Sequence, residues 1–132
     1  MNGKNTAGRA AEETRKAALE LARVLEDGKG GDVLILDVSG VNAFADFFVI
    51  ATVSSSAHMR GLHRAVTEAA AALNLHTVPV KQSNSASEEW LLVDFGGILV
   101  HLMTAPARAF YDLENLWFSA EKIRPASAGE NC

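Results

Sequence analysis

The chain has 132 residues, of which 12 are Lys or Arg and 16 are Asp or Glu, so its formal net charge at pH 7 is −4. This length is typical of a single domain, and a hydrophobic content of 48% is enough to build a core without a metal or a disulfide. The slightly acidic balance disfavours direct, sequence-independent binding of nucleic acid and favours a protein partner or a small ligand.

The only cysteine is Cys132, which excludes an internal disulfide framework and a cysteine-based zinc site. No apolar run approaches the roughly 18 residues needed to span a bilayer, and the N-terminus lacks the apolar core of a secretory signal. We therefore expect a cytoplasmic protein that does not enter a membrane.

The first patterned segment runs from Arg9 to Asp27, where apolar residues recur at the spacing of an amphipathic helix. Residues 1–8 have no such pattern, and we predict that they are a flexible segment outside the fold. The domain is predicted to span residues 9–119. Small and polar residues at 120–132 predict a flexible C-terminal tail.

Two apolar runs follow, at residues 32–38 and 47–53, and each predicts a strand that is buried on both faces. The loop between them is short enough to make the two strands antiparallel neighbours. Three serines at 54–56 then offer hydroxyl groups that cap a helix. The apolar stripe of that helix is predicted to cover the sheet and consists of Met59, Leu62, Val66, Ala69, Ala70 and Leu73.

A weaker strand pattern covers residues 75–80. Pro79 within it cannot donate a hydrogen bond to a neighbouring strand, so we place this strand near an edge of the sheet. Residues 81–87 are polar and are predicted to form a loop.

Residues 90–95 and 98–103 carry the strongest local pattern, a β-hairpin with a two-residue Gly-Gly turn. Such a turn fixes the register, which pairs Phe95 with Ile98 and Trp90 with Met103. One face of the hairpin is then entirely apolar and is predicted to lie against core helices; it carries Leu91, Val93, Phe95, Ile98, Val100 and Leu102. The opposite face, termed here the mixed face, carries Trp90, Leu92, Asp94, Leu99, His101 and Met103.

The mixed face combines an indole, aliphatic side chains and two titratable groups, a composition typical of the centre of a recognition patch. We interpret it as a docking surface. The sequence leaves an alternative equally open, in which another helix of the domain covers this face. In that case Asp94 and His101 bond to each other or to nearby backbone groups.

The last predicted helix begins near Pro106, which suits a first helical turn, and runs to about Leu113. Three aromatic residues lie in or after it, at Phe110, Tyr111 and Trp117. Such residues more often anchor a terminal helix than contact a ligand.

Motifs for catalysis or cofactor binding do not assemble. The chain has neither a phosphate-binding glycine motif nor a nucleophile elbow, and His58 and His63 are five residues apart, which does not suit a helical metal site. We predict no metal and no cofactor. Asp37 and Asp46 could be paired carboxylates, but hydrogen bonds that close the intervening loop explain them better.

Four segments together resemble the ribosomal silencing factor family, also called Iojap or RsfS. They are ADFFVIAT at 45–52, WLLVDFG at 90–96, VH at 100–101 and FYDLENLW at 110–117, in the order and spacing of that family. The resemblance extends from about residue 19 to residue 117. Two positions depart from it: Val53 stands where glycine is common, and Gly97 replaces a polar residue at the hairpin tip.

This resemblance implies an α/β single domain with a mixed β-sheet of about five strands, flanking helices and a nucleotidyltransferase-like topology without catalytic residues. It implies a non-enzymatic factor that binds the large ribosomal subunit at ribosomal protein fourteen. By blocking association with the small subunit, the factor would repress translation under nutrient limitation. The implied partner-binding residues are Trp90, Leu92, Asp94, Phe95 and His101.

Two other hypotheses stay open at this stage. In the first, kinship with nucleotidyltransferases extends to function, and the chain is a nucleotide-binding enzyme that uses Asp37, Asp46 and the serines at 54–56. In the second, the mixed face is a self-association surface and the free protein is a homodimer, as the family resemblance also implies.

Overall fold

A computed structural model describes residues 2–41, 45–77, 89–117 and 119–123. The elements in chain order are α1 (Asn2–Asp27), β1 (Gly31–Asp37), β2 (Phe47–Val53), α2 (Ser56–Ala72), β3 (Trp90–Asp94), β4 (Ile98–Thr104), α3 (Ala105–Tyr111), α4 (Leu113–Leu116) and β5 (Glu121–Ile123). The predicted α/β domain with a mixed sheet is confirmed. The strand order is β3-β4-β2-β1-β5; β2 and β4 run parallel, and the other neighbours run antiparallel.

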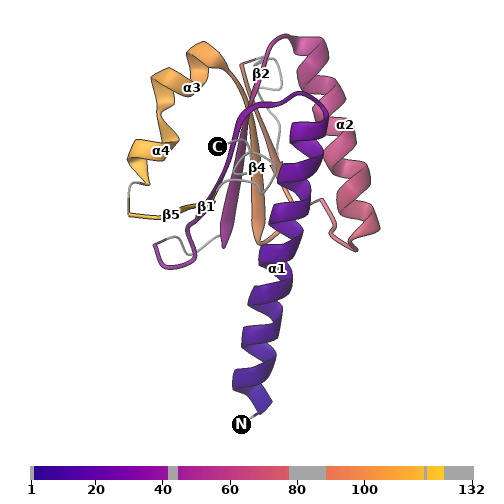
Figure 1. Ribbon diagram of the computed structural model, residues 1–132, viewed down its shortest axis with the longest axis vertical. Coiled ribbons are helices and arrows are strands. Elements are labelled where there is room, and N and C mark those ends of the chain that lie inside the picture. The colour runs from indigo at the N-terminus through magenta and orange to yellow at the C-terminus, as the bar shows by residue number, and fades with distance from the viewer. Residues whose placement is uncertain (1, 42–44, 78–88, 118, 124–132) are drawn as a thin grey trace.

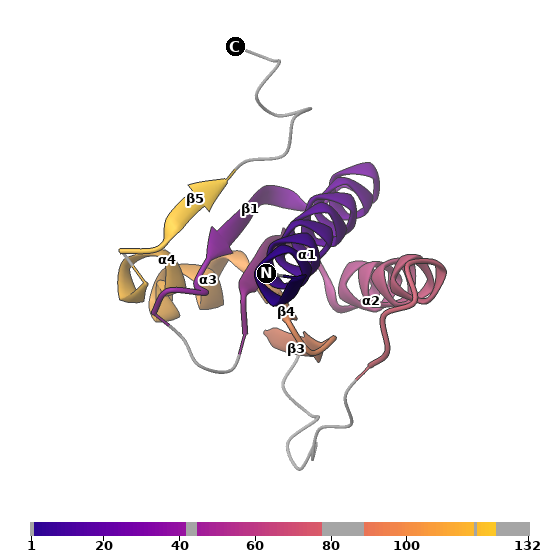
Figure 2. The ribbon, with the colours of Figure 1, turned by 90° about the horizontal axis from the view of Figure 1, so that it is seen from below.

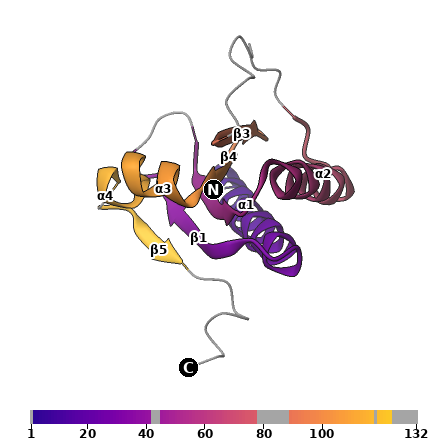
Figure 3. The same ribbon diagram turned by 90° about the horizontal axis from the view of Figure 1, so that it is seen from above.

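Helices cover both faces of this sheet, with α1 and α2 on one face and α3 and α4 on the other (Figure 1). The same division is visible from below, where the strands separate the two pairs of helices (Figure 2). The view from above also shows α1 and α2 on one side of the strands and α3 and α4 on the other (Figure 3). The N-terminal part of α1 extends beyond the sheet (Figure 1). No helix among the described residues is both long and apolar enough to cross a membrane.

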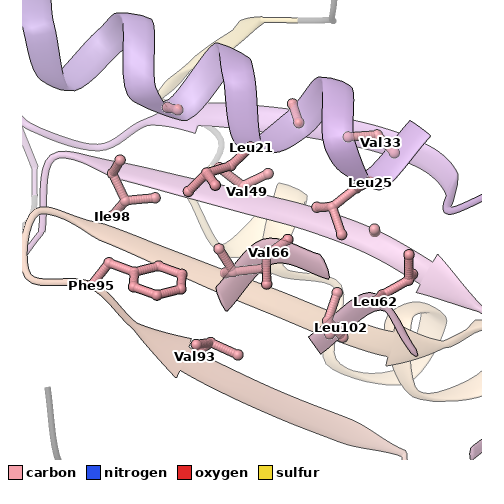
Figure 4. Close-up of a cluster of buried hydrophobic side chains, with 14 of the residues drawn as sticks. Leu21, Leu25, Val33, Val49, Leu62, Val66, Val93, Phe95, Ile98 and Leu102 are labelled. Carbon is pink, nitrogen blue, oxygen red and sulfur yellow. The ribbon is translucent and has the colours of Figure 1, made fainter. Parts of the chain in front are cut away.

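The larger core lies between the sheet and the helices α1 and α2 (Figure 4). Leu21 and Leu25 of α1 are fully buried there, because the helical spacing of four places both on the side that faces the sheet. The predicted stripe of α2 is confirmed for its buried members Met59, Leu62, Val66 and Ala70. Leu73, at the end of the stripe, is 38% exposed.

The hairpin of β3 and β4 has the predicted register. Trp90 lies opposite Met103, and Asp94 lies opposite Leu99. At the turn, the backbone N–H of Phe95 donates to the carbonyl of Ile98 at 2.9 Å. Gly96 has a φ of 90°, which glycine adopts easily because it has no Cβ.

Two ends of the fold differ from the prediction. The helix begins at Asn2 rather than Arg9, because each residue added to an existing helix gains a hydrogen bond even without an amphipathic pattern. Residues 121–123, predicted as part of a flexible tail, form β5 and pair with β1. This pairing satisfies backbone groups along the outer side of β1. The rest of the predicted tail, residues 124–132, lies outside the described residues.

The predicted edge strand at residues 75–80 is wrong over its first half. Residues 75–77 have no strand structure, and among the described strands the two edges of the sheet are β3 and β5. Residues 78–80, together with the predicted loop at 81–87, lie outside the described residues.

Candidate functional site

The mixed face of the hairpin is covered only in part by α3 and α4. Two of its side chains are buried: Met103 is 0% exposed and His101 is 4% exposed. The other four are half-buried, namely Trp90, Leu92, Asp94 and Leu99. Two of these four are apolar members of β3, the strand at the edge of the sheet, so apolar surface stays accessible there.

The position of α3 is fixed by its first turn and by one buried cation. Thr104 precedes the helix, and its hydroxyl accepts a hydrogen bond from the backbone N–H of Ala107 at 3.3 Å. Arg108 is 8% exposed; its guanidinium donates to the Thr52 hydroxyl at 2.9 Å and to the Glu114 carboxylate at 3.0 Å. These bonds join α3 to β2 and α4, and they hold the last residue of α3 beside the hairpin.

That last residue, Tyr111, packs on Trp90, with ring centroids 4.6 Å apart. Phe110 meets Tyr111 edge to face at 5.0 Å. We name Trp90, Tyr111 and Phe110 the aromatic row. Phe110 is 80% exposed and Tyr111 is 48% exposed, so the row presents aromatic surface to solvent.

The sequence therefore assigned the C-terminal aromatic residues only partly correctly. Trp117 anchors its segment as expected, because its ring meets that of Phe48 edge to face at 5.6 Å. Phe110 and Tyr111 instead extend the mixed face. No local pattern reports this, since the contact between Tyr111 and Trp90 depends on where α3 crosses the sheet.

Asp94 does not bond to His101, but it bonds to a nearby backbone group, as the alternative interpretation allowed. Its carboxylate accepts a hydrogen bond from the backbone N–H of Gly96 at 2.8 Å and so holds the hairpin turn. Two exposed carboxylates are next to the aromatic row in the sequence, with Glu89 directly before Trp90 and Asp112 directly after Tyr111.

His101 lies beneath the aromatic row rather than on the surface. Its Nδ1 accepts a hydrogen bond from the indole N–H of Trp90 at 3.1 Å, and its ring packs on Phe48 with centroids 4.7 Å apart. Its Nε2 is buried and has no hydrogen-bond partner among the described residues. Burial lowers the pKa of His101 to about 4, so the imidazole is neutral at pH 7.

Phe95 also lies below the surface. It is 4% exposed and belongs to the core formed with α1 and α2, on the apolar face of the hairpin. Of the five residues that the family resemblance implied for partner binding, Phe95 and His101 are thus not accessible in this structure. Trp90, Leu92 and Asp94 are accessible in part.

The residues considered for other chemistry have local structural roles. The Asp37 carboxylate accepts from the Ser39 backbone N–H at 3.1 Å and from its hydroxyl at 2.7 Å, which confirms the expected loop hydrogen bonds for Asp37. Ser55 caps α2 as predicted, by accepting from the His58 backbone N–H at 3.0 Å. Within the described part of the chain, no three His, Cys, Asp or Glu residues are grouped so that they could hold a metal ion.

Gly97, where the chain departs from the family pattern, faces the protein's own residues. A Cβ built there would lie 3.3 Å from a carboxylate oxygen of Asp46 and 3.5 Å from the side-chain methyl group of Thr14. A larger residue at this position would first meet these two side chains. The other departure, Val53, is 3% exposed and forms the buried end of β2.

Comparison with known proteins gives consistent matches. A family model described as "Ribosomal silencing factor during starvation" matches residues 11–131. Ribosomal silencing factor RsfS of Treponema pallidum is 48% identical over 101 residues, which cover 76% of this chain and 89% of that protein. The mouse protein named "Mitochondrial assembly of ribosomal large subunit protein 1" is 30% identical over 98 residues, covering 74% of this chain and 43% of that protein.

A crystal structure of a protein from Chromobacterium violaceum has a similar fold. Its TM-score is 0.68 at 33% sequence identity, and the match covers 80% of this chain and 84% of that chain. The similarity therefore includes most of this chain.

Proposed function

This chain belongs to the ribosomal silencing factor family, and from that premise we propose that it binds the large ribosomal subunit at ribosomal protein fourteen and blocks association with the small subunit. Translation would thereby be repressed under nutrient limitation. The observation that carries this proposal is the aromatic row, in which Trp90 is half-buried at the sheet edge beside two exposed rings.

Exposed aromatic side chains on a fixed scaffold are typical of interface centres. They bury a large area when a partner binds and lose little conformational freedom, which is why Trp and Tyr are frequent among residues that dominate binding energy. In the free protein, the ring of Tyr111 already contacts both Trp90 and Phe110. The row therefore supports a preformed protein-docking surface.

The charges around the row favour a basic protein surface over RNA. Glu89 and Asp112 are exposed beside it, and Asp94 is half-buried nearby. Arg108, the cation of α3, is 8% exposed and is paired with Glu114. Within the described segment 89–117, Arg108 is the only Lys or Arg, so the accessible charges there are carboxylates. Carboxylates repel phosphate and attract Lys or Arg, which supports a ribosomal protein as the direct partner.

The proposed mechanism is occlusion and needs no chemical step, so we infer that the protein is not an enzyme. An interface of standard size covers about 800 Å² on each partner, and a 14.1 kDa body held there would overlap an approaching small subunit. The steric repulsion of overlapping atoms would exceed the binding free energy that contacts between the subunits supply. The name of the mouse relative, which refers to the large subunit, supports the choice of subunit.

The test is co-sedimentation of the full chain with purified large and small subunits, together with a subunit-joining assay. We expect Trp90→Ala to weaken large-subunit binding by at least ~2 kcal/mol, or about 30-fold, and to restore joining in proportion. Leu73→Ala is the matched control, because Leu73 is an exposed apolar residue at the end of α2, on the other side of the sheet. Equal pelleting of folded Trp90→Ala and the wild-type chain would count against the proposal.

The same surface is our proposed site for a homodimer of the free protein. Mass measurement in solution, with the chain alone and with isolated ribosomal protein fourteen, tests whether the two interfaces are shared. A homodimer that converts to a 1:1 complex indicates one shared surface, whereas a 2:2 complex excludes it.

A further inference from the structure

The indole of Trp90 is held from two sides. Its N–H donates to Nδ1 of His101 at 3.1 Å, and its ring packs on Tyr111 at 4.6 Å. An indole nitrogen can only donate, so Nδ1 of His101 is the acceptor and the proton of the neutral imidazole is on Nε2. The hydrogen bond therefore defines both the tautomer of His101 and the direction in which the indole points.

Packing alone does not account for a histidine at this position. Nε2 of His101 carries a proton, is buried, and has no acceptor among the described residues. Buried donors are nearly always paired, because leaving one unpaired opposes folding. A leucine would fill a similar volume without that penalty. The hydrogen bond from Trp90 is the favourable polar contact that distinguishes histidine from leucine here.

We propose that His101 is a positioning residue, whose Nδ1 fixes the indole of Trp90 against Tyr111 and so presets the aromatic row for its partner. The proposal rests on the proposed function of that row. With its nitrogen bonded inward, the indole offers only carbon to a partner, and it enters the complex in an orientation that is already ordered. Ordering before binding reduces the entropy that association loses.

The protonation state of His101 is compatible with this role. Because burial lowers its pKa to about 4, the lone pair on Nδ1 is available throughout the neutral range. The ring of Phe48, 4.7 Å away, supports the imidazole from β2, so the acceptor is itself held in place.

A matched pair of variants separates the acceptor from the volume of the side chain. Leu and Asn both branch at Cγ and have the same number of side-chain heavy atoms, but only the amide oxygen of Asn can take the place of Nδ1. In affinity for purified large subunits, we expect Leu to cost about 10-fold and Asn less than about 3-fold, the difference expected for one hydrogen bond. In a Trp90→Phe background, which lacks the N–H, the two variants should bind within about 2-fold of each other.

Two outcomes of this cycle would overturn the proposal. One is full affinity of His101→Leu in the wild-type background. The other is an equal loss for Leu and Asn whether or not Trp90 is present, which would mean that His101 acts through general packing.

A second readout needs no ribosome and keeps the proposal separate from the proposed function. In the free, isotope-labelled chain, we expect His101→Leu to shift the indole N–H resonance of Trp90 and to speed its exchange with water, while His101→Asn restores slow exchange. Trp117 supplies the internal reference, and Trp90→Phe assigns the signals. If the wild-type chain does not bind large subunits, the proposed function fails, and an unchanged Trp90 signal in His101→Leu would still reject the positioning role.

Discussion

The two faces of the sheet are built differently, although β4 contributes to both. On the side of α1 and α2, Ile98, Val100 and Leu102 are at most 1% exposed within an apolar core. On the side of α3 and α4, the alternate residues of the same strand include half-buried Leu99 and buried His101, whose Nε2 has no hydrogen-bond partner in the part of the chain that the structure describes. The face under α1 and α2 forms a sealed apolar core that stabilises the fold. The face under α3 and α4 contains a buried polar side chain and is only partly covered by helices.

The lengths of the helices explain part of this difference. The first face is covered by helices of 26 and 17 residues, and the second by helices of 7 and 4 residues. Two short helices cannot reach along the whole hairpin, so the edge strand β3 keeps accessible apolar surface. The same shortness puts Tyr111, at the end of α3, beside Trp90.

Truncating one leucine on each face should change the free energy of unfolding by very different amounts. Leu102→Ala leaves a cavity in the sealed core and should lower the free energy of unfolding by about 2–5 kcal/mol. Leu99→Ala, three residues earlier on the other face, should cost less, about 1 kcal/mol, because Leu99 is only half-buried against the core and water can fill the space that its truncation leaves. Chemical denaturation measures the free energy of unfolding of both variants. Equal losses of that free energy would contradict the distinction between the two faces.

Acid should destabilise the protein through the mixed face. The pKa of His101 falls from 6.5 to about 4 in the folded chain because of burial, so between these values the unfolded state binds more protons. Stability is therefore lost as pH falls from about 6.5 to about 4, by about 3 kcal/mol for this group. Denaturation of the wild-type chain and His101→Leu at pH 7 and pH 4 isolates the effect, and identical acid losses would contradict it.

The outer end of the aromatic row should affect binding without affecting folding. Phe110 is 80% exposed, so Phe110→Ala should change the free energy of unfolding by less than about 0.5 kcal/mol. We expect it to weaken large-subunit binding by about 1 kcal/mol, or roughly 5-fold, in co-sedimentation. Unaltered binding would limit the docking surface to β3.

Adding a nucleotide with Mg²⁺ should leave the melting temperature of the protein unchanged. A ligand that binds the native state raises the melting temperature, so a nucleotidyltransferase-type site would appear as a shift at millimolar ligand. We expect less than about 1 °C, because no three His, Cys, Asp or Glu residues in the described part of the chain are grouped so that they could hold Mg²⁺. A clear, concentration-dependent rise would revive the enzyme hypothesis.

The sequence predicted the features that depend on neighbouring residues. A two-residue turn determined the hairpin register, and the apolar runs located β1 and β2 to within a residue. It did not predict β5, whose three residues carry no pattern of their own and are ordered by pairing with β1.

The candidate site was predictable in part for the same reason. Strand alternation placed Trp90 and His101 on one face. The depth of His101 and the contact between Trp90 and Tyr111 both depend on α3, which reaches this face through the hydrogen bond between Arg108 and Thr52, residues 56 positions apart. Local periodicity contains no information about contacts at that range.

Footprinting of the bound chain shows which face of the protein meets the large subunit. Hydroxyl-radical labelling of the full chain, free and bound to large subunits, reports which side chains a partner covers. We expect Phe110, Tyr111 and Trp90 to become protected and the exposed residue Leu73 to keep its reactivity. Protection of Leu73 with no change along the aromatic row would show that the chain docks through its other side and would contradict the account.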